Sequence, residues 1–420
     1  MNLTETQRAM ASGDEGEAVA AAMTVLIEYG EIMGAERLIP ISSAAGANIY
    51  GPRHSRPLGS DDPARLFAQY SLNTDAALDA PPVRVPSCQL IGPIDRENAG
   101  DVQNMPPEAI AKVAESSDYL DGLGVSLLST CTPYQVGFLP RFGEHVAWME
   151  SSAVVFINSV IGARTNTEGR ESAAASMLTG LTPEAGLHLD APRRATVRIV
   201  VDTEIPATFG WNAFGYWIGS AVEDRVPVLD GVQAAPDFVQ LKQFGAAAAS
   251  SGDVELFHLP GVTAECTSVE QVITDDAEVL TFGAAELAWA IDRLNATRTG
   301  DDVDFVMIGC PHASYEQLQQ VAALLDGRRV DDGTALWIFT PDALRRRARD
   351  EGLLALIESS GARILSDTCP AIAQFLPRGT RRFATDSAKQ AHYLPAIMGI
   401  EGAFATTADC VQAALTGRLP

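Results

Sequence analysis

The chain has 420 residues, which is more than one simple core accommodates, so we expect two or three subdomains. Its 54 acidic and 30 basic residues give a formal net charge of −24. That acidity argues against nucleic-acid binding, because no basic field attracts phosphates. A membrane span is not expected either, because no apolar run approaches the roughly 20 residues that it needs.

Targeting and disulfide signals are not visible in the sequence. Residues 1–11 lack the basic-then-apolar pattern of a signal peptide. The six cysteines lie far apart and form no C-x-x-C pair, which argues against a disulfide framework, a zinc ribbon and thioredoxin-like chemistry. We therefore expect a cytoplasmic protein with reduced thiols.

The first third of the chain predicts helices and strands around an irregular segment. Ser12 and Glu15 have the spacing of a capping box. Residues 51–106 are rich in Pro, Gly, Asp and Asn, which is typical of a functional loop region. The predicted elements are a helix over 12–33, a strand over 38–41, a small-residue loop over 42–46, and helices over 61–70 and 106–123.

Three cysteines follow short predicted strands, and each has a proline within two residues. They are Cys131, Cys310 and Cys369, after strands predicted over 125–128, 305–308 and 362–365. The carboxyl ends of parallel strands are where α/β folds place ligands, and a helix start favours the thiolate over the thiol. Three thiolates on one metal would leave a coordination position open. The alternative is a set of buried structural cysteines, which is how we interpret the other three.

Charged and polar candidates accompany these cysteines. His312 lies in the same turn as Cys310, and Glu150 precedes an apolar run that would perturb its pKa and suit it to acid–base work. Arg164 and Arg170 could clamp a carboxylate or phosphate in fork geometry. Lys389, one of three lysines, starts a predicted helix and invites an anion-binding interpretation. The alternative is a solvated loop with surface ion pairs.

Regular alternation of strands and helices continues to the C-terminus. Helix starts are predicted at Ser314 and Ser387 by capping boxes, at Thr267 with Glu270, and at Thr340 with Pro341 in the first turn. The remaining predicted elements are strands over 195–201, 254–258 and 336–339, and helices over 168–178, 210–221, 236–249, 284–294, 314–325 and 408–415.

The whole chain resembles the large subunit of the aconitase X family, a divergent branch of the aconitase superfamily. This resemblance implies an α/β fold with several α/β/α subdomains around a central cleft, over approximately 1–200, 201–300 and 301–420. Five motifs in order carry it: Cys-Thr-Pro-Tyr (131–134), the segment from Glu150 to Asn166, Gly-Cys-Pro-His (309–312), Ser-Asp-Thr-Cys-Pro (366–370) and Ser-Ala-Lys-Gln-Ala-His-Tyr (387–393).

The resemblance also assigns site residues. Cys131, Cys310 and Cys369 would hold an iron–sulfur cluster, with 2Fe–2S favoured, or a mononuclear iron. Catalytic roles would fall to Glu150, His312 and Lys389. Substrate-binding roles would fall to Ser43, Asn73, Ser151, Asn158, Arg164, Thr165, Asn166 and Arg170. The chain departs from the family in loop 42–46, which lacks the His that often follows the Ser pair, and in segment 72–75.

Members of this family are dehydratases. Bacterial members convert cis-3-hydroxy-L-proline to pyrroline-2-carboxylate, and archaeal members act on phosphomevalonate. We expect a hydro-lyase of the first kind, with phosphomevalonate as the alternative substrate. The family's small swivelling domain is expected on a separate subunit, since the chain ends at Pro420, and the catalytic base is expected there. A non-catalytic metal-binding subunit and an iron-free protein with idle thiols are the remaining alternatives.

Overall fold

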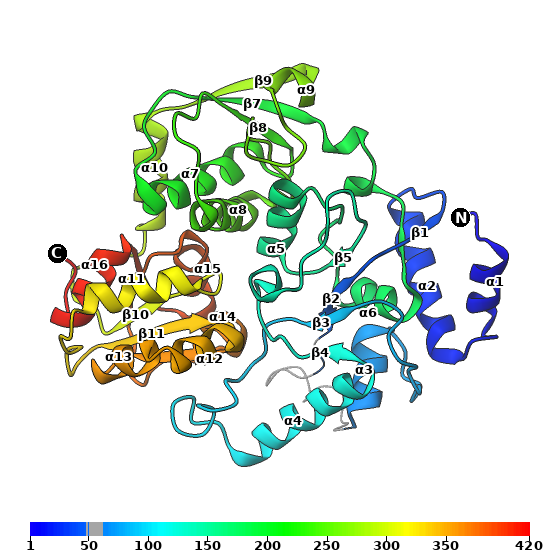
Figure 1. Cartoon of the computed structure of the whole chain (residues 1–420), viewed down its shortest axis with the longest axis horizontal. Coiled ribbons are helices and arrows are strands. Elements are labelled where there is room, and N and C mark those ends of the chain that lie inside the picture. The colour runs from blue at the N-terminus through cyan, green and yellow to red at the C-terminus, as the bar shows by residue number, and fades with distance from the viewer. Residues whose placement is uncertain (48, 50–61) are drawn as a thin grey trace.

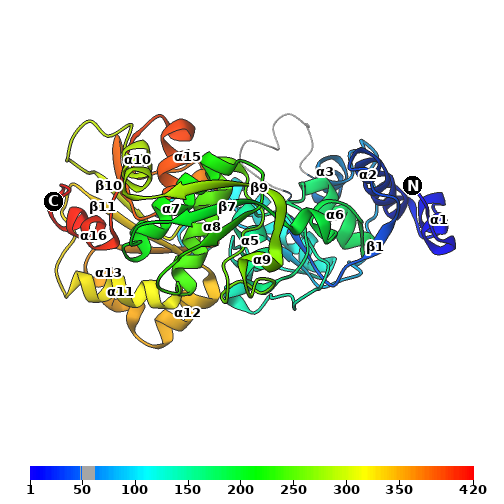
Figure 2. The ribbon, with the colours of Figure 1, turned by 90° about the horizontal axis from the view of Figure 1, so that it is seen from above.

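A computed structural model of the chain describes residues 1–47, 49 and 62–420. Over these residues helices alternate with strands that are mostly parallel, which confirms the predicted α/β class. Figure 1 shows three sheet-containing regions in chain order, coloured blue to cyan, green, and yellow to red. In the view from above, the two ends of the chain lie at opposite ends of the long axis (Figure 2).

The N-terminal region is built on a parallel sheet of order β4-β3-β2-β5 and a separate antiparallel pair of β1 and β6. Its strands are β1 (Leu38–Pro40), β2 (Ala44–Ala47), β3 (Ser87–Gln89), β4 (Val125–Ser126), β5 (Ala147–Trp148) and β6 (Leu181–Pro183). Its helices are α1 (Glu5–Ser12), α2 (Glu17–Ile32), α3 (Pro63–Ser71), α4 (Pro107–Gly122), α5 (Ser151–Phe156) and α6 (Arg170–Thr179).

The first predicted helix is wrong in its start. The chain instead forms α1, capped by a box of Thr4 and Gln7, and then α2. Gly13 and Gly16 separate the two helices, with φ of 91° and 101°. Only glycine adopts such angles without strain, so the backbone turns here and Ser12 ends a helix where we predicted that it begins one.

The middle region is a three-stranded parallel sheet of order β8-β7-β9 with helices packed against it. The predicted strand over 254–258 is wrong, because this segment forms only an isolated bridge between His258 and Val228. The sequence analysis missed both other strands of this sheet, β8 and β9, and acidic residues interrupt the apolar pattern of β9. The helix predicted at Thr267 is the single turn α9, which has Ser268 at its N-cap position. The elements are β7 (Ala195–Val201), β8 (Pro227–Asp230), β9 (Ile273–Phe282), α7 (Ala207–Val222), α8 (Phe238–Gly252), α9 (Val269–Val272) and α10 (Ala284–Leu294).

Helices α7 and α8 pack backbone to backbone through glycines. A Cβ added at Gly219 would lie 2.3 Å from the carbonyl oxygen of Ala248, and one at Gly252 would lie 1.8 Å from the carbonyl oxygen of Gly219. No side chain fits at these separations, so the contact fixes α8 tightly in the middle of the molecule, where it also packs against α5 and against α15 (Ala388–Met398).

The C-terminal region is a five-stranded, all-parallel sheet of order β12-β11-β10-β13-β14. The first strand of this region, β10, is the central one, so the strand order reverses beside it, as in doubly wound folds. The strands are β10 (Phe305–Ile308), β11 (Ala335–Thr340), β12 (Arg363–Ser366), β13 (Arg382–Thr385) and β14 (Glu401–Phe404). The helices are α11 (Tyr315–Leu325), α12 (Asp342–Asp350), α13 (Leu353–Ser359), α14 (Pro370–Ala373), α15 (Ala388–Met398) and α16 (Thr407–Thr416).

The helix caps of this region largely follow the sequence. Ser314 and Gln317 form the predicted capping box of α11, and the Ser387 hydroxyl accepts from the backbone of Gln390 at the start of α15. Helix α12 begins one residue later than predicted, with Pro341 as its N-cap. The two faces of β10 belong to different cores: Val306 and Ile308 pack under α11, α13 and α16, and Phe305 and Met307 face the cysteine loops.

Candidate active site

Three cysteines from distant parts of the chain line one cavity of about 230 Å³. Cys131 follows β4 in the N-terminal region, whereas Cys310 and Cys369 follow β10 and β12 in the C-terminal sheet. Glu150, at the start of α5, and Lys389, at the start of α15, line the same cavity. His312, the third predicted catalytic residue, lines it as well, so the residues predicted as metal ligands and as catalytic groups are neighbours in the fold.

The topology of the C-terminal sheet explains this meeting. Cys310 leaves the carboxyl end of β10, and Lys389 follows the carboxyl end of the adjacent β13. The chain connections after these two strands run in opposite directions across the sheet, so a crevice opens between them. Gly309 begins the turn with a φ of 98°, and a Cβ there would lie 2.1 Å from the carbonyl oxygen of Phe339. Only glycine lets the loop of Cys310 pass so close to β11.

Burial sets the protonation of the three thiols. Desolvation raises the pKa of Cys131 and of Cys310, and it raises the pKa of Cys369 to about 12. We expected a helix start to favour the thiolate. The backbone amides of Ala371 and Ile372 do lower the pKa of Cys369, but burial raises it by more. A metal bound here would displace the thiol protons.

Hydrogen-bond donors nevertheless point at two of the sulfurs. The backbone N–H of His312 donates to Sγ of Cys131 at 3.3 Å, and Nε2 of Gln390 donates to Sγ of Cys310 at 3.2 Å. Such donors stabilise a charged sulfur more than a neutral one. These two contacts make the cavity a better environment for thiolate ligands than its burial alone suggests.

His312 ties the three cysteine loops together. It is fully buried, its Nε2 lies 3.0 Å from the carbonyl oxygen of Thr368, and its Nδ1 lies 2.8 Å from Oγ1 of Thr130. A carbonyl only accepts, so Nε2 carries the proton and Nδ1 accepts from the threonine hydroxyl. Burial lowers the pKa of His312 to about 4, which keeps the ring neutral. The imidazole thus bridges Thr130 and Thr368, the residues that precede Cys131 and Cys369. Its Nε2 proton is donated to the Thr368 carbonyl.

Glu150 and Lys389 form the charged pair of the cavity. Nζ of Lys389 lies 2.8 Å from Oε1 of Glu150 and 3.4 Å from Oγ of Ser151, and Ser152 donates to the same carboxylate at 2.9 Å. Burial alone would raise the pKa of Glu150, but the Lys389 ammonium holds that pKa below its usual value. Burial would likewise lower the pKa of Lys389, and the carboxylate outweighs it and raises that pKa. Both side chains are therefore charged at neutral pH.

The three thiols of the cavity are a donor set that fits iron. Among the described residues, no three His, Cys, Asp or Glu side chains are already arranged around one point as ligands of a metal ion. Thiolates are ligands of iron in proteins, both in clusters and at single ions. Three cysteines on a common cavity, with N–H donors aimed at two of the sulfurs, therefore fit an iron centre.

Most of the predicted substrate-binding residues lie outside the described walls of this cavity. Ser43 accepts from Nε1 of Trp148 at 3.3 Å, Asn73 is exposed after α3 with a φ of 51°, and the Arg170 guanidinium stacks over Tyr70 at 5.1 Å. Ser151 alone reaches the site, through Lys389.

The segment of Asn158, Thr165 and Asn166 forms an internal hydrogen-bond network. Nδ2 of Asn158 donates to the carbonyl of Thr165 at 2.9 Å, and Oδ1 of Asn166 accepts from the backbone of Leu187 at 2.8 Å. Oγ1 of Thr165 donates to the carbonyl of Asn166 at 2.7 Å. These contacts hold backbone in place and leave the binding roles of the three residues as predictions.

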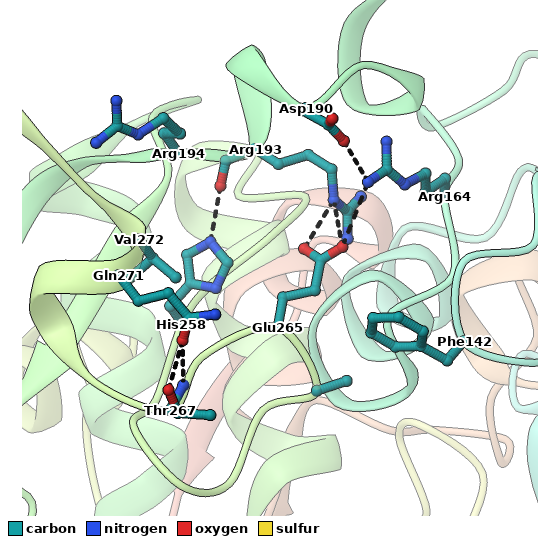
Figure 3. Close-up of a pocket in the computed structure, with 11 residues that line it drawn as sticks. Phe142, Arg164, Asp190, Arg193, Arg194, His258, Glu265, Thr267, Gln271 and Val272 are labelled. Carbon is teal, nitrogen blue, oxygen red and sulfur yellow. Dashed lines mark hydrogen bonds and ion pairs between the residues drawn. The ribbon is translucent and has the colours of Figure 1, made fainter.

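Arg164 lines a different, larger pocket of about 420 Å³, between the N-terminal and middle regions (Figure 3). Its guanidinium pairs with Asp190 and donates to the carbonyl of His188 at 3.0 Å. Beside it, the buried Arg193 pairs with Glu265 at 2.9 Å. The arginines of this pocket are largely satisfied by protein groups, so it does not offer the free anion clamp predicted for Arg164.

The sequence analysis missed two further residues, one that lines the cysteine cavity and one that contacts the His312 turn from outside it. Gln390 was identified only as part of a helix cap, yet it donates to Cys310. Lys242, on α8, is fully buried and donates to the carbonyl of His312 at 2.8 Å and to Oε1 of Gln317 at 2.7 Å. The available signal was a single lysine in a predicted helix that is mostly apolar, although Gln240 and Gln243 flank it.

Comparisons with known proteins agree with this architecture. Family models described as the first, second and third domains of aconitase X match residues 1–191, 195–292 and 303–416. The chain is 34% identical over 412 residues to the phosphomevalonate dehydratase large subunit of Methanocaldococcus jannaschii, covering 96% of this chain and 98% of that protein. It is 36% identical over 428 residues to the cis-3-hydroxy-L-proline dehydratase of Pseudomonas aeruginosa, covering 98% of this chain and 70% of that protein.

A solved structure shares the whole fold. The crystal structure of Thermococcus kodakaraensis aconitase X in its holo-form superimposes with a TM-score of 0.84 at 30% identity, over 99% of this chain and 100% of that chain. In the part of the chain that the structure describes, no helix has the length and apolar character needed to cross a membrane.

Proposed function

Because the chain belongs to the aconitase X family, we propose that it is the large subunit of an iron-dependent hydro-lyase that removes water from a small hydroxy acid. The observation that carries this proposal is the cavity in which Cys131, Cys310 and Cys369 meet the pair of Glu150 and Lys389. The enzyme would have three subdomains, at about 1–200, 201–300 and 301–420, with the first boundary moved to just before β7 so that each contains its own sheet.

The three cysteines would hold the iron centre, for which we favour a 2Fe–2S cluster over a mononuclear iron. When bound, such a centre supplies a Lewis acid that makes the substrate hydroxyl a better leaving group. Lys389, which stays protonated, binds the substrate carboxylate. Glu150 stays ionised, so it accepts a hydrogen bond and orients the substrate. His312, with its proton committed to the Thr368 carbonyl, positions the cysteine loops and does not act as an acid.

Dehydration needs a base to take the proton next to the carboxylate while hydroxide leaves from the neighbouring carbon. We place this base on a small partner subunit, in keeping with relatives that are named large subunits and with the 70% coverage of the longer Pseudomonas aeruginosa dehydratase. The charge of the cavity favours cis-3-hydroxy-L-proline as substrate. Among its described walls, Lys389 is the sole charged cation and Glu150 the sole anion, which matches a zwitterion better than a phosphate-bearing acid.

The test is reconstitution with iron and sulfide under anaerobic conditions, together with the small subunit, followed by assays of both substrates. We expect iron binding and turnover of cis-3-hydroxy-L-proline, and loss of both in Cys310→Ser. The matched control is Cys410→Ala, which removes a buried thiol from the opposite core of the same sheet and should keep iron and activity. Full turnover without iron would refute the proposal, and turnover of phosphomevalonate alone would establish the alternative substrate.

A further inference from the structure

Helix α15 is a wall of two cavities. It gives four residues to the cysteine cavity: Lys389, Gln390, Tyr393 and Ile397. From another face it gives four residues to a second cavity of about 400 Å³: Ala391, His392, Pro395 and Ala396. Helix α7 and the end of α10 complete this second cavity, which we call the α15 pocket, and no described lining residue is common to the two cavities. A molecule bound in the α15 pocket would touch the helix that carries Lys389 without entering the cysteine cavity.

The α15 pocket contains a cation and no carboxylate. Arg293, in the last turn of α10, is its one permanently charged lining residue among those the structure describes. In the described part of the chain no Asp or Glu lines the pocket and none pairs with Arg293, although the sequence has 54 acidic residues. A guanidinium presents a fork of N–H donors that matches a carboxylate. The charge of the pocket therefore favours an anionic ligand.

His392 supplies a second donor, which Tyr216 orients. The hydroxyl of the buried Tyr216 lies 3.2 Å from Nδ1 of His392. A phenol donates more readily than a neutral imidazole, so Nδ1 accepts this hydrogen bond and the ring proton lies on Nε2. Burial, and after it the Arg293 guanidinium, lower the pKa of His392, which keeps the ring neutral. The pocket thus offers the guanidinium and the Nε2–H group as donors, with a single positive charge.

The rest of the α15 pocket is largely apolar. Its hydrocarbon walls are Leu294, Ala296, Ala391, Pro395, Ala396 and Ile400. Apolar walls with a few convergent polar groups are typical of sites for small organic molecules, and the volume lies in their range. One cation beside such walls matches a monoanion with a hydrocarbon body better than it matches a phosphate dianion, which would need a second cation.

We propose that the α15 pocket binds a small monocarboxylic acid, with the carboxylate held by Arg293 and His392 and the hydrocarbon part against α15. The bound acid would join α10 of the middle region to α15 of the C-terminal region, and α15 carries Lys389 and Gln390 at the cysteine cavity. The proposal goes beyond the hydro-lyase activity and does not depend on it.

The test is the modification of arginines by phenylglyoxal in the full chain, followed residue by residue with mass spectrometry. The probe is cyclopentanecarboxylate at about 10 mM, which is about tenfold above a Kd of about 1 mM. Because Arg293 is exposed, the reagent reaches it, and we expect the probe to slow its modification by about tenfold. The internal control is Arg329, an exposed arginine outside the pocket, whose rate should not change. In His392→Leu, protection should need roughly three- to tenfold more probe, because one donor is lost.

Two further compounds test the class of ligand. Cyclopentanecarboxamide has the shape of the probe without its charge, and inorganic phosphate has charge without a hydrocarbon body, so neither should protect Arg293 at the same concentration. Equal protection by either compound would overturn the assignment of a monocarboxylic acid. An Arg293 rate that the acid leaves unchanged would overturn the site itself, and undiminished protection in His392→Leu would overturn the pair of donors. The readout is local to Arg293, so it is independent of iron and of the hydro-lyase assay.

Discussion

Lys389 and Glu150, 239 residues apart in the chain, form an ion pair of 2.8 Å at the wall of the cysteine cavity. The lysine comes from the C-terminal sheet and the glutamate from the N-terminal region, so the pair closes the site across the junction of two regions. Each partner keeps the other charged despite burial. The proposed roles of both residues depend on this mutual effect.

Lys389→Met is expected to lower kcat/KM by about 10²-fold or more, because it removes the cation that binds the substrate carboxylate. It also leaves Glu150 buried without its partner, so the carboxyl should become protonated more easily. Steady-state kinetics of Lys389→Met, Glu150→Gln and the double variant form a cycle. Additive losses in the double variant would mean that the two side chains act independently and would contradict their coupling.

His312→Gln should weaken the site without removing a metal ligand. The amide can keep one of the two hydrogen bonds of the ring but cannot span from Thr130 to Thr368. We expect a loss of about 1–3 kcal/mol in the free energy of unfolding, because a buried donor or acceptor loses its partner. Urea denaturation measures the stability, and iron release to a chelator should accelerate in parallel. An inactive variant with wild-type stability and iron retention would instead support a chemical role for the imidazole.

A buried carboxyl outside the site predicts a pH dependence of stability. Burial raises the pKa of Glu168 to about 7 from its usual 4.5, and Oε2 of this residue has no partner in the described structure. Between these pH values the folded chain holds a proton that the unfolded chain releases. The contribution to stability is therefore complete below pH 4.5 and is lost as the pH rises through 7, by about 3 kcal/mol in all.

Glu168→Gln should remove this dependence, because an amide does not titrate. We expect the variant to gain stability relative to the wild type between pH 5 and pH 8, as measured by urea unfolding at both values. Glu171→Gln is the control, since it removes an exposed charge from the first turn of α6, three residues further along the chain. Parallel pH profiles of the wild type and Glu168→Gln would show that another group is responsible.

Local sequence patterns predicted three strands of the C-terminal sheet, β10, β11 and β12, and missed β13 and β14. An apolar run that stops at Gly309 and the capping box of Ser314 and Gln317 leave little choice for β10 and α11, which occur where expected. The same patterns failed at β9, where strand formation depends on pairing with β7 and not on an apolar alternation of its own. They also failed at 254–258, an apolar stretch that is buried without joining the sheet as a strand.

The place of Cys310 in the site was predictable, because a thiol follows directly after the carboxyl end of a predicted strand. Side-chain direction was not predictable, and it decides that Arg164 faces Asp190 while Glu150 faces Lys389. Lys242 donates to the His312 carbonyl, 70 residues away, and no local pattern encodes such a tertiary contact.

We predict that substitution of the buried arginine in the pocket of Figure 3 lowers stability and leaves catalysis unchanged. The Arg193 guanidinium is 3% exposed and joins the N-terminal region, through the carbonyls of Leu187 and Asn158, to Glu265 of the middle region. Arg193→Met would leave Glu265 without its closest partner and two carbonyls unpaired, at a cost of about 3–5 kcal/mol. Arg194→Met, at the exposed neighbouring residue, should cost less than about 1 kcal/mol.

Thermal unfolding of the two variants measures this difference in stability. Catalysis is measured as the kcat of the folded fraction of Arg193→Met protein at low temperature. We expect an unchanged kcat, because Arg193 lines the arginine pocket and not the cysteine cavity. Equal melting temperatures for Arg193→Met and Arg194→Met would show that the seam between the two regions does not depend on the buried guanidinium. A specific loss of kcat at wild-type stability would instead connect this pocket to the reaction.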